Sequence, residues 1–122
     1  MSVDFSAFDV ITFDCYGTLI DWETGLLGAL RPVLTGHDAE AADDELLGAY
    51  ARHEAELEAG PYLTYREVLG ESLRRVGKGL GFEPTATEVD AFAGSVGDWP
   101  AFPDSADALA SLHSDYRLAP IT

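Results

Sequence analysis

The pattern of hydrophobic and polar positions predicts a short strand near each end of the chain and helices between them. Val10–Phe13 is an apolar, β-branched run, which is typical of a strand buried on both faces. Arg117–Thr122 predicts a second buried strand with Leu118–Ile121 as its paired part, although Pro120 removes one backbone donor from it. The two strands therefore enclose a largely helical segment.

Helical spacing of apolar residues predicts four helices after the first strand and a fifth just before the second. Capping boxes, in which a Thr hydroxyl and a Glu carboxylate bond to each other's backbone N–H groups, start the third and fourth helices at Thr64–Glu67 and Thr85–Glu88. Asp38 is a candidate N-cap of the second helix, and Asp104 or Ser105 of the fifth. The expected helices are Trp22–Leu34, Ala39–Ala59, one from Tyr65 through Leu80, one from Thr85 through Val96, and one through Leu109 and Leu112.

This order of elements predicts an α/β unit that is interrupted by a helical insertion. Residues 1–21 and 99–122 would form the core, and residues 22–98 the insertion. We expect the two strands to be adjacent and parallel, joined by a right-handed crossover. Asp14 and Thr122, which follow them, would then meet at one edge of the sheet.

Composition and charge exclude several classes of partner. The chain has 122 residues, of which 47% are hydrophobic, so it can form a globular core. Twenty-two acidic residues against seven basic ones give a net charge of −15, which repels nucleic acid and anionic membranes. The N-terminal residues lack the basic start and the apolar stretch that are typical of a signal peptide, and no apolar run approaches the ~20 residues that span a bilayer. The single cysteine allows no internal disulfide, so we expect a cytoplasmic protein, in a cytoplasm whose salt screens the acid surplus.

Asp14 is the residue best placed for chemistry. It directly follows the first strand, and ligands of open α/β sheets bind outside the carboxyl ends of strands. Gly17 permits a sharp turn, and Thr18 brings a hydroxyl four residues after the acid. An ordinary turn would explain Asp and Gly but not this combination. The pattern therefore favours a functional site.

These residues resemble two motifs of a known family. Phe13-Asp14-Cys15-Tyr16-Gly17-Thr18-Leu19 resembles the first motif of the haloacid dehalogenase superfamily, an aspartate nucleophile followed by a turn and a threonine. Arg117–Thr122 is similar to the strand that leads to the second motif, whose last member is Ser or Thr. The resemblance implies an α/β fold, a partial Rossmann-like core with an inserted four-helix cap.

Tyr16 is the residue that separates the branches of this superfamily. Its phosphatases carry a second aspartate there, which protonates an alkoxide leaving group, whereas a halide leaves without a proton. Tyr16 thus resembles the 2-haloacid dehalogenase branch, and a structural Tyr16 beside some other acid is the alternative. The resemblance implies a hydrolase that converts short 2-haloacids, which are small anions, to 2-hydroxy acids without a cofactor. Magnesium is implied only under the phosphatase alternative.

The resemblance also implies roles for individual residues. Asp14 would attack the halogen-bearing carbon, and Thr18 would hydrogen-bond Asp14 and fix its rotamer. The backbone N–H groups of Cys15 and Tyr16, with the hydroxyl of Thr122, would hold the substrate carboxylate. The Cys15 side chain itself should point away from Asp14.

Arg52 is the candidate cation for the departing halide, since the dehalogenases use an arginine of the cap. The alternative is that Arg52 pairs with Glu56, four residues along a solvated helix face. His53 lies on the apolar face of the same helix and is expected to be packed.

Later motifs of the superfamily, a lysine and then acids on further strands, have no counterpart in this sequence. Lys78, its sole lysine, lies in the insertion. We therefore expect an N-terminal part of a longer enzyme that is inactive alone, and a homodimer is compatible with this picture. A non-catalytic fragment that binds a partner through exposed strand edges is the alternative from another functional class.

Overall fold

The computed structural model describes residues 2–122, which form two compact units. The strand unit combines the residues before Glu23 with Pro100–Thr122, and the helical unit is Glu23–Trp99. The chain runs from the strand unit into the helical unit and then back into the strand unit, so the helical unit is an insertion. The predicted α/β fold with a helical insertion is confirmed.

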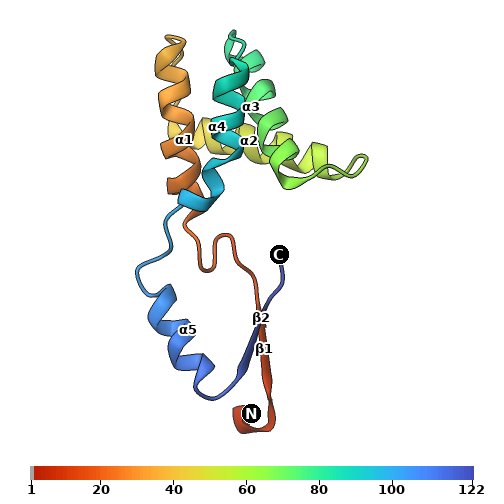
Figure 1. Cartoon of the computed structure of the whole chain (residues 1–122), viewed down its shortest axis with the longest axis vertical. Coiled ribbons are helices and arrows are strands. Elements are labelled where there is room, and N and C mark those ends of the chain that lie inside the picture. Colours follow the sequence, from red (N-terminus) through yellow and green to blue (C-terminus); the bar gives the residue numbers. More distant parts are fainter. Residues whose placement is uncertain (1) are drawn as a thin grey trace. The chain divides into compact units, whose positions relative to one another are not determined.

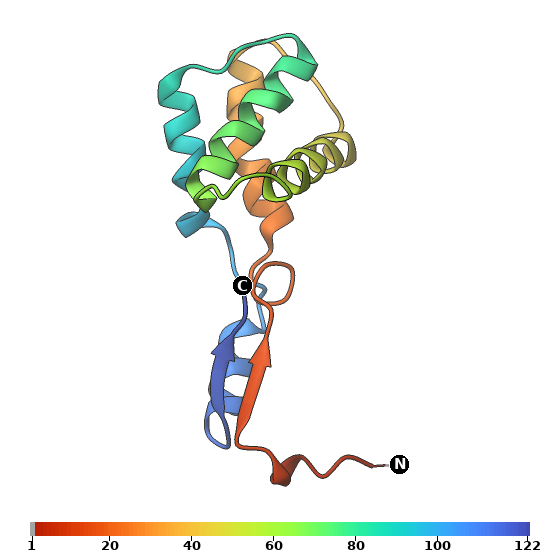
Figure 2. The same cartoon turned by 90° about the vertical axis from the view of Figure 1, so that its right-hand side faces the viewer.

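The strand unit contains a two-stranded parallel sheet and a helix that packs against it (Figures 1 and 2). The strands are adjacent and parallel, as the sequence predicted, and Figure 2 shows both arrows pointing the same way. Their last pair joins Phe13 to Pro120. The elements are η1 (Phe5–Ala7), β1 (Val10–Phe13), α5 (Ser105–His113) and β2 (Arg117–Pro120).

Pro120 does not interrupt the pairing of the strands. The N–H groups of Arg117 and Ile121 donate to the carbonyls of Asp9 and Phe13 at 2.9 Å and 2.8 Å. Alternate residues of β2 therefore face β1, and Pro120 belongs to the other set, whose N–H positions face away. A proline can occupy this position without the loss of a sheet hydrogen bond.

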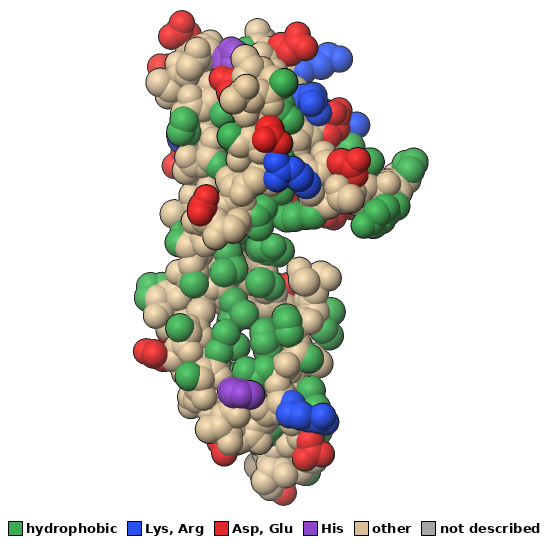
Figure 3. Space-filling view, in the orientation of Figure 1, with side chains coloured by type: hydrophobic (Ala, Val, Ile, Leu, Met, Phe, Trp, Pro, Cys, Tyr) green, Lys and Arg blue, Asp and Glu red, His purple; other side chains and the backbone are tan. Residues whose placement is uncertain are grey.

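The prediction that the first strand is buried on both faces is wrong within the described residues. Val10 is 41% exposed, Thr12 is also exposed, and Ile11 and Phe13 are half-buried. The reason is that β1 has one strand neighbour, and the described helix of the unit packs against β2. Figure 3 shows hydrophobic side chains open to solvent on the visible face of this unit.

The helical unit packs around buried leucines and one buried tyrosine, Tyr50. Helix α3 packs against both α2 and α4. The leucines with at most 1% exposure come from three helices, so the core belongs to the unit as a whole: Leu26, Leu30, Leu34, Leu46, Leu69 and Leu73. The elements are α1 (Trp22–Gly36), α2 (Asp43–Glu58), α3 (Tyr65–Leu80), α4 (Ala86–Ala93) and η2 (Ser95–Asp98).

Both predicted capping boxes are confirmed, at Thr64 and Thr85. The predicted ends of other helices are wrong. The first helix continues through Gly36, and the fourth stops at Ala93, where a 3-10 turn follows. Helix α5 begins at Ser105. Its N-cap residue is Asp104, whose side chain makes no capping hydrogen bond.

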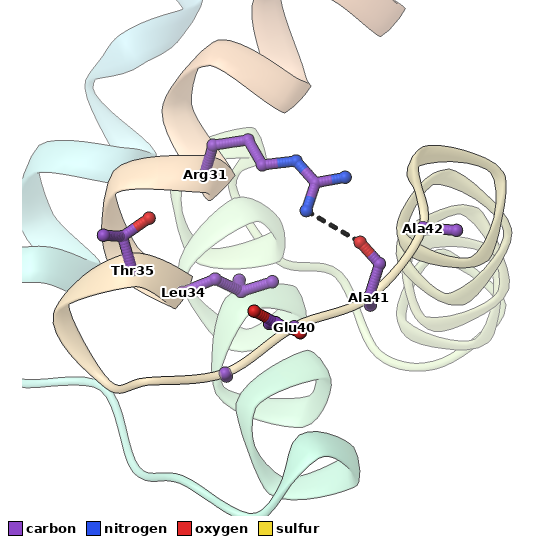
Figure 4. A pocket seen from close by; sticks show the side chains of 7 residues that line it. Arg31, Leu34, Thr35, Glu40, Ala41 and Ala42 are labelled. Carbon is purple, nitrogen blue, oxygen red and sulfur yellow. Dashed lines mark hydrogen bonds between the residues drawn. The ribbon is translucent and has the colours of Figure 1, made fainter.

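The second helix begins four residues later than predicted, and Asp38 does not cap it. Its N-cap is Ala42, in extended backbone. The Arg31 side chain explains this shift, because it donates to the Ala41 carbonyl at 2.7 Å (Figure 4) and also pairs with Asp43. These contacts from α1 hold the residues before Asp43 as a linker.

The two ends of the insertion lie close together. In the helical unit Trp99 is 7% exposed and packs so closely on Gly25 that a Cβ there would overlap its ring. In the strand unit the Asp21 N–H donates to the Pro100 carbonyl at 2.8 Å. The linkers are therefore paired where the chain leaves and re-enters the strand unit.

Candidate active site at the carboxyl end of the strands

The turn after β1 is held by hydrogen bonds that converge on one carbonyl. The N–H groups of Thr18, Leu19 and Ile20 all donate to the Cys15 carbonyl, at 3.2, 2.8 and 3.1 Å. Gly17 has φ +87°, a left-handed conformation that favours glycine. The turn is therefore tight, and it fixes the backbone that directly follows Asp14.

Asp14 is exposed at the mouth of this turn and has two unlike carboxylate oxygens. The Thr18 hydroxyl donates to Oδ2 at 3.1 Å, so the predicted hydrogen bond is present. Oδ1 has no hydrogen-bond partner among residues 2–122, and neither has the Cys15 N–H beside it. A free carboxylate oxygen and a free backbone donor therefore lie next to each other in sequence.

Tyr16 is half-buried in the turn. Burial, and to a smaller extent the neighbouring Cys15, raises the pKa of its phenol above the ordinary value. The hydroxyl therefore stays protonated and uncharged across the physiological pH range.

Thr122 lies at the same edge of the sheet as Asp14, but the two are not opposite each other. Because Phe13 pairs with Pro120, the residue opposite Asp14 is Ile121, and Thr122 comes one residue later. Its side chain is exposed, and its hydroxyl has no partner among the described residues. The strand ends thus bring a carboxylate and a hydroxyl to one edge.

Arg52 is exposed on α2, in the helical unit, and the predicted alternative of a pair with Glu56 is wrong. Glu56 lies 3.5 Å from Arg75 of α3 and 3.5 Å from His53 instead. Among residues 2–122 Arg52 forms no ion pair. His53 has a side chain only 17% exposed, as a packed residue has.

The strand unit is short of positive charge at the edge that Asp14 occupies. It contains seven acidic residues and one arginine, Arg117. Arg117 pairs with Val10 at the other end of the strands. An anion beside Asp14 would therefore need backbone N–H groups, or a cation from outside this unit.

Ser105 contacts the turn and was not predicted as a site residue. It is 5% exposed, and its hydroxyl donates to the Leu19 carbonyl at 2.7 Å. The two residues are 86 positions apart, so the local sequence carries no signal of this contact beyond a serine at a helix start.

Other features of the described chain offer weaker sites. A hollow of about 520 Å³ between the end of α1 and the start of α2 is lined by Arg31 (Figure 4), but its guanidinium already donates to the Ala41 carbonyl and forms an ion pair with Asp43. Residues 2–122 contain no group of three or more His, Cys, Asp or Glu side chains that could hold a metal ion. In the same range, every helix is too short or too polar to cross a membrane.

Comparison with known proteins gives a structural match without a sequence match. No family model and no curated protein matches the chain. A defluorinating L-2-haloacid dehalogenase superposes with a TM-score of 0.77 at 24% identity, over 92% of this chain and 49% of that one. The L-2-haloacid dehalogenase of Xanthobacter autotrophicus gives 0.73 at 23% identity, over 93% and 46%. YfnB of Bacillus subtilis, a HAD-type protein bound to magnesium, gives 0.73 at 18% identity, over 94% and 53%.

At these identities the similarity shows the fold. The chain has the fold of the haloacid dehalogenase superfamily, a partial Rossmann-like core with a helical insertion, so the resemblance seen in the sequence is confirmed at that level. The chain spans about half the length of these solved structures.

Proposed function

We propose that this chain supplies the nucleophile and the cap of a hydrolase that cleaves the carbon–halogen bond of short 2-haloacids. One observation carries the proposal: Asp14 stands at the carboxyl end of β1 with one oxygen bonded to Thr18 and the other free. Carboxylates so placed act as nucleophiles in covalent catalysis. The similarity in fold to dehalogenases supports a hydrolase function but does not assign the substrate.

In the proposed reaction Oδ1 of Asp14 attacks C2 of the substrate. The carbon–halogen bond breaks, the halide leaves with the bonding electrons, and an ester joins Asp14 to the substrate. Water then attacks the carbonyl carbon of this ester. The products are a 2-hydroxy acid, the regenerated Asp14 carboxylate and a proton. Thr18 keeps Oδ2 occupied, so that Oδ1 faces the carbon.

The substrate carboxylate needs donors in a unit that is short of cations. The free Cys15 N–H and the Thr122 hydroxyl are proposed to bind it, with the Tyr16 backbone beside them. These are neutral dipoles, which do not quench the charge on Asp14 as an adjacent ammonium would.

Tyr16 favours a halide over an alkoxide as the leaving group. A phenol whose pKa is raised by burial is a weak acid, so it would protonate a departing alkoxide poorly. A halide needs no proton, so this turn meets the demands of carbon–halogen cleavage.

Arg52 is proposed to bind the departing halide. Its exposure and its lack of an ion pair leave its charge available, whereas Arg31, Arg66 and Arg75 are all paired with acids. Magnesium belongs to the phosphatase alternative, and the proposed carbon–halogen cleavage calls for none.

The decisive experiment is an assay of halide release from 2-chloropropionate by the full-length protein. We expect equimolar halide and lactate, and a loss of at least about 1,000-fold in kcat for Asp14→Asn, because the amide cannot act as the nucleophile. Asp9→Asn is the matched control. Asp9 is an exposed aspartate directly before the first residue of the same strand, so its loss should leave kcat unchanged.

Two results would contradict the proposal. One is halide release that survives in Asp14→Asn. The other is magnesium-dependent turnover of phosphate esters without halide release, which would favour the phosphatase alternative.

A further inference from the structure

Ser105 ties the turn after β1 to helix α5. Ser105 is the first residue of this helix and is 5% exposed. A serine at a helix start commonly bonds to N–H groups of its own helix. Here the hydroxyl instead donates to the Leu19 carbonyl at 2.7 Å, and the Phe102 N–H donates to the same carbonyl at 2.9 Å.

The peptide groups of Leu19 connect this contact to Asp14. The Leu19 N–H donates to the carbonyl of Cys15, the residue directly after Asp14, at 2.8 Å. Thr18, directly before Leu19, donates its hydroxyl to Asp14. A displacement of Leu19 would therefore reach Asp14 through its neighbour in sequence and through its hydrogen-bond donor.

We propose that Ser105 is a positioning residue for Asp14, which acts through the Leu19 carbonyl. When the hydroxyl is removed, the Leu19 carbonyl retains the Phe102 N–H, so the turn persists but has one fewer anchor. The Asp14 carboxylate then spends less time in the orientation needed for attack. The effect on the reaction rests on the proposed function, whereas the effect on the turn does not.

A matched pair of variants isolates the hydroxyl. Ser105→Thr and Ser105→Val add nearly the same volume at a buried position, so packing strain is common to both and only Thr retains the donor. In the full-length protein we expect kcat for 2-chloropropionate in the Val variant to be about tenfold below that of the Thr variant, with KM within about twofold. Backbone hydrogen exchange at Leu19 and Ile20 should be faster in the Val variant.

Ser111→Val is the control, because Ser111 is an exposed serine of the same helix and should change neither measurement. Equal kcat in the Thr and Val variants, or a kcat difference without an exchange difference, would overturn the proposal. If none of the proteins releases halide, the proposed function is wrong, and hydrogen exchange alone then tests the role of Ser105 in the turn. Faster exchange in the Val variant then supports the role of Ser105 in the turn, and equal exchange rejects it.

Discussion

The Thr18 hydroxyl donates a 3.1 Å hydrogen bond to Oδ2 of Asp14, four residues before it. This contact makes the two carboxylate oxygens unequal. Thr18→Val should lower kcat for halide release about tenfold, because a hydrogen bond to a charged group contributes about 1.5–3 kcal/mol and this one is exposed. Thr18→Ser keeps the donor and should retain most of the activity. Unchanged kcat in Thr18→Val, which keeps a methyl group but has no donor, would show that the hydrogen bond does not matter.

Gly17 and Gly81 allow the turn and a helix end to be compared. Both have positive φ, +87° and +86°. Alanine at either position should cost about 1–2 kcal/mol of unfolding free energy, measured in urea, because a Cβ is strained there. Only Gly17→Ala should also reduce halide release, since Gly81 ends α3 in the helical unit. A Gly81→Ala protein with lower activity at equal folded fraction would refute this separation.

Two glycines of α1 should respond to alanine with opposite signs. Gly25 contacts the Trp99 ring, and a Cβ would overlap it, so Gly25→Ala should destabilise the protein by about 1–3 kcal/mol. Gly28 has nothing near its Cβ position, so Gly28→Ala should stabilise α1 by about 0.5–1 kcal/mol. Thermal melts of both variants provide the test. A stabilising Gly25→Ala would mean that Trp99 does not pack on α1 in solution.

Glu88 should make the protein acid-sensitive. Its carboxylate accepts the Thr85 N–H at 2.7 Å and lies 2.8 Å from His37 Nε2. The hydrogen bond from His37, then that from Thr85, lowers the pKa of Glu88 in the folded state. A lowered folded-state pKa stabilises the fold above the unfolded pKa of about 4.3, and this stability is lost as the pH falls through the folded value.

The melting temperature of the wild type should therefore fall as the pH is lowered from pH 5 to pH 3, a range of about one unit either side of the unfolded pKa. The melting temperature of Glu88→Gln should fall less steeply over the same range. Glu83→Gln, at an exposed glutamate outside the capping box, is the control and should follow the wild type. An unchanged slope in Glu88→Gln would contradict the assignment.

Glu54 should make the protein less stable at neutral pH than in acid, which is the opposite of the effect of Glu88. Burial, with a smaller contribution from Glu58, raises its pKa in the folded state. A raised folded-state pKa favours folding in acid, and this stability is lost as the pH rises through the folded value, so the carboxylate is a cost at neutral pH. Glu54→Gln should raise the melting temperature at pH 7 and give no gain near pH 4. Glu45→Gln, in the exposed first turn of the same helix, is the control and should not raise the melting temperature at either pH.

The parts of the fold that could be predicted are those with a local cause. The two strands, the capping boxes at Thr64 and Thr85, and the Asp14–Thr18 hydrogen bond all depend on residues within four positions of each other. Their chemistry is visible in a short window of sequence.

The parts that could not be predicted depend on distant residues. The start of α2 is set by Arg31, ten residues before Ala41 in the sequence but across a helix end in space. The Ser105–Leu19 contact spans 86 residues. The exposure of β1 follows from how many neighbours the strand has, which its own composition does not state. The roles of Thr122, Tyr16 and Arg52 remain predictions.

The two linkers between the units are joined by a hydrogen bond, so the helical unit could be replaced by another helical insertion. The chain leaves the strand unit at Asp21 and returns at Pro100, and these two residues are hydrogen-bonded neighbours. An insertion whose ends meet costs the host little, whatever its length, because loop-closure entropy grows only slowly with loop size. A different helical module could therefore be inserted at the same position without shifting the register of β1 and β2. The backbone that holds Asp14 would then stay the same while the helices of the insertion change.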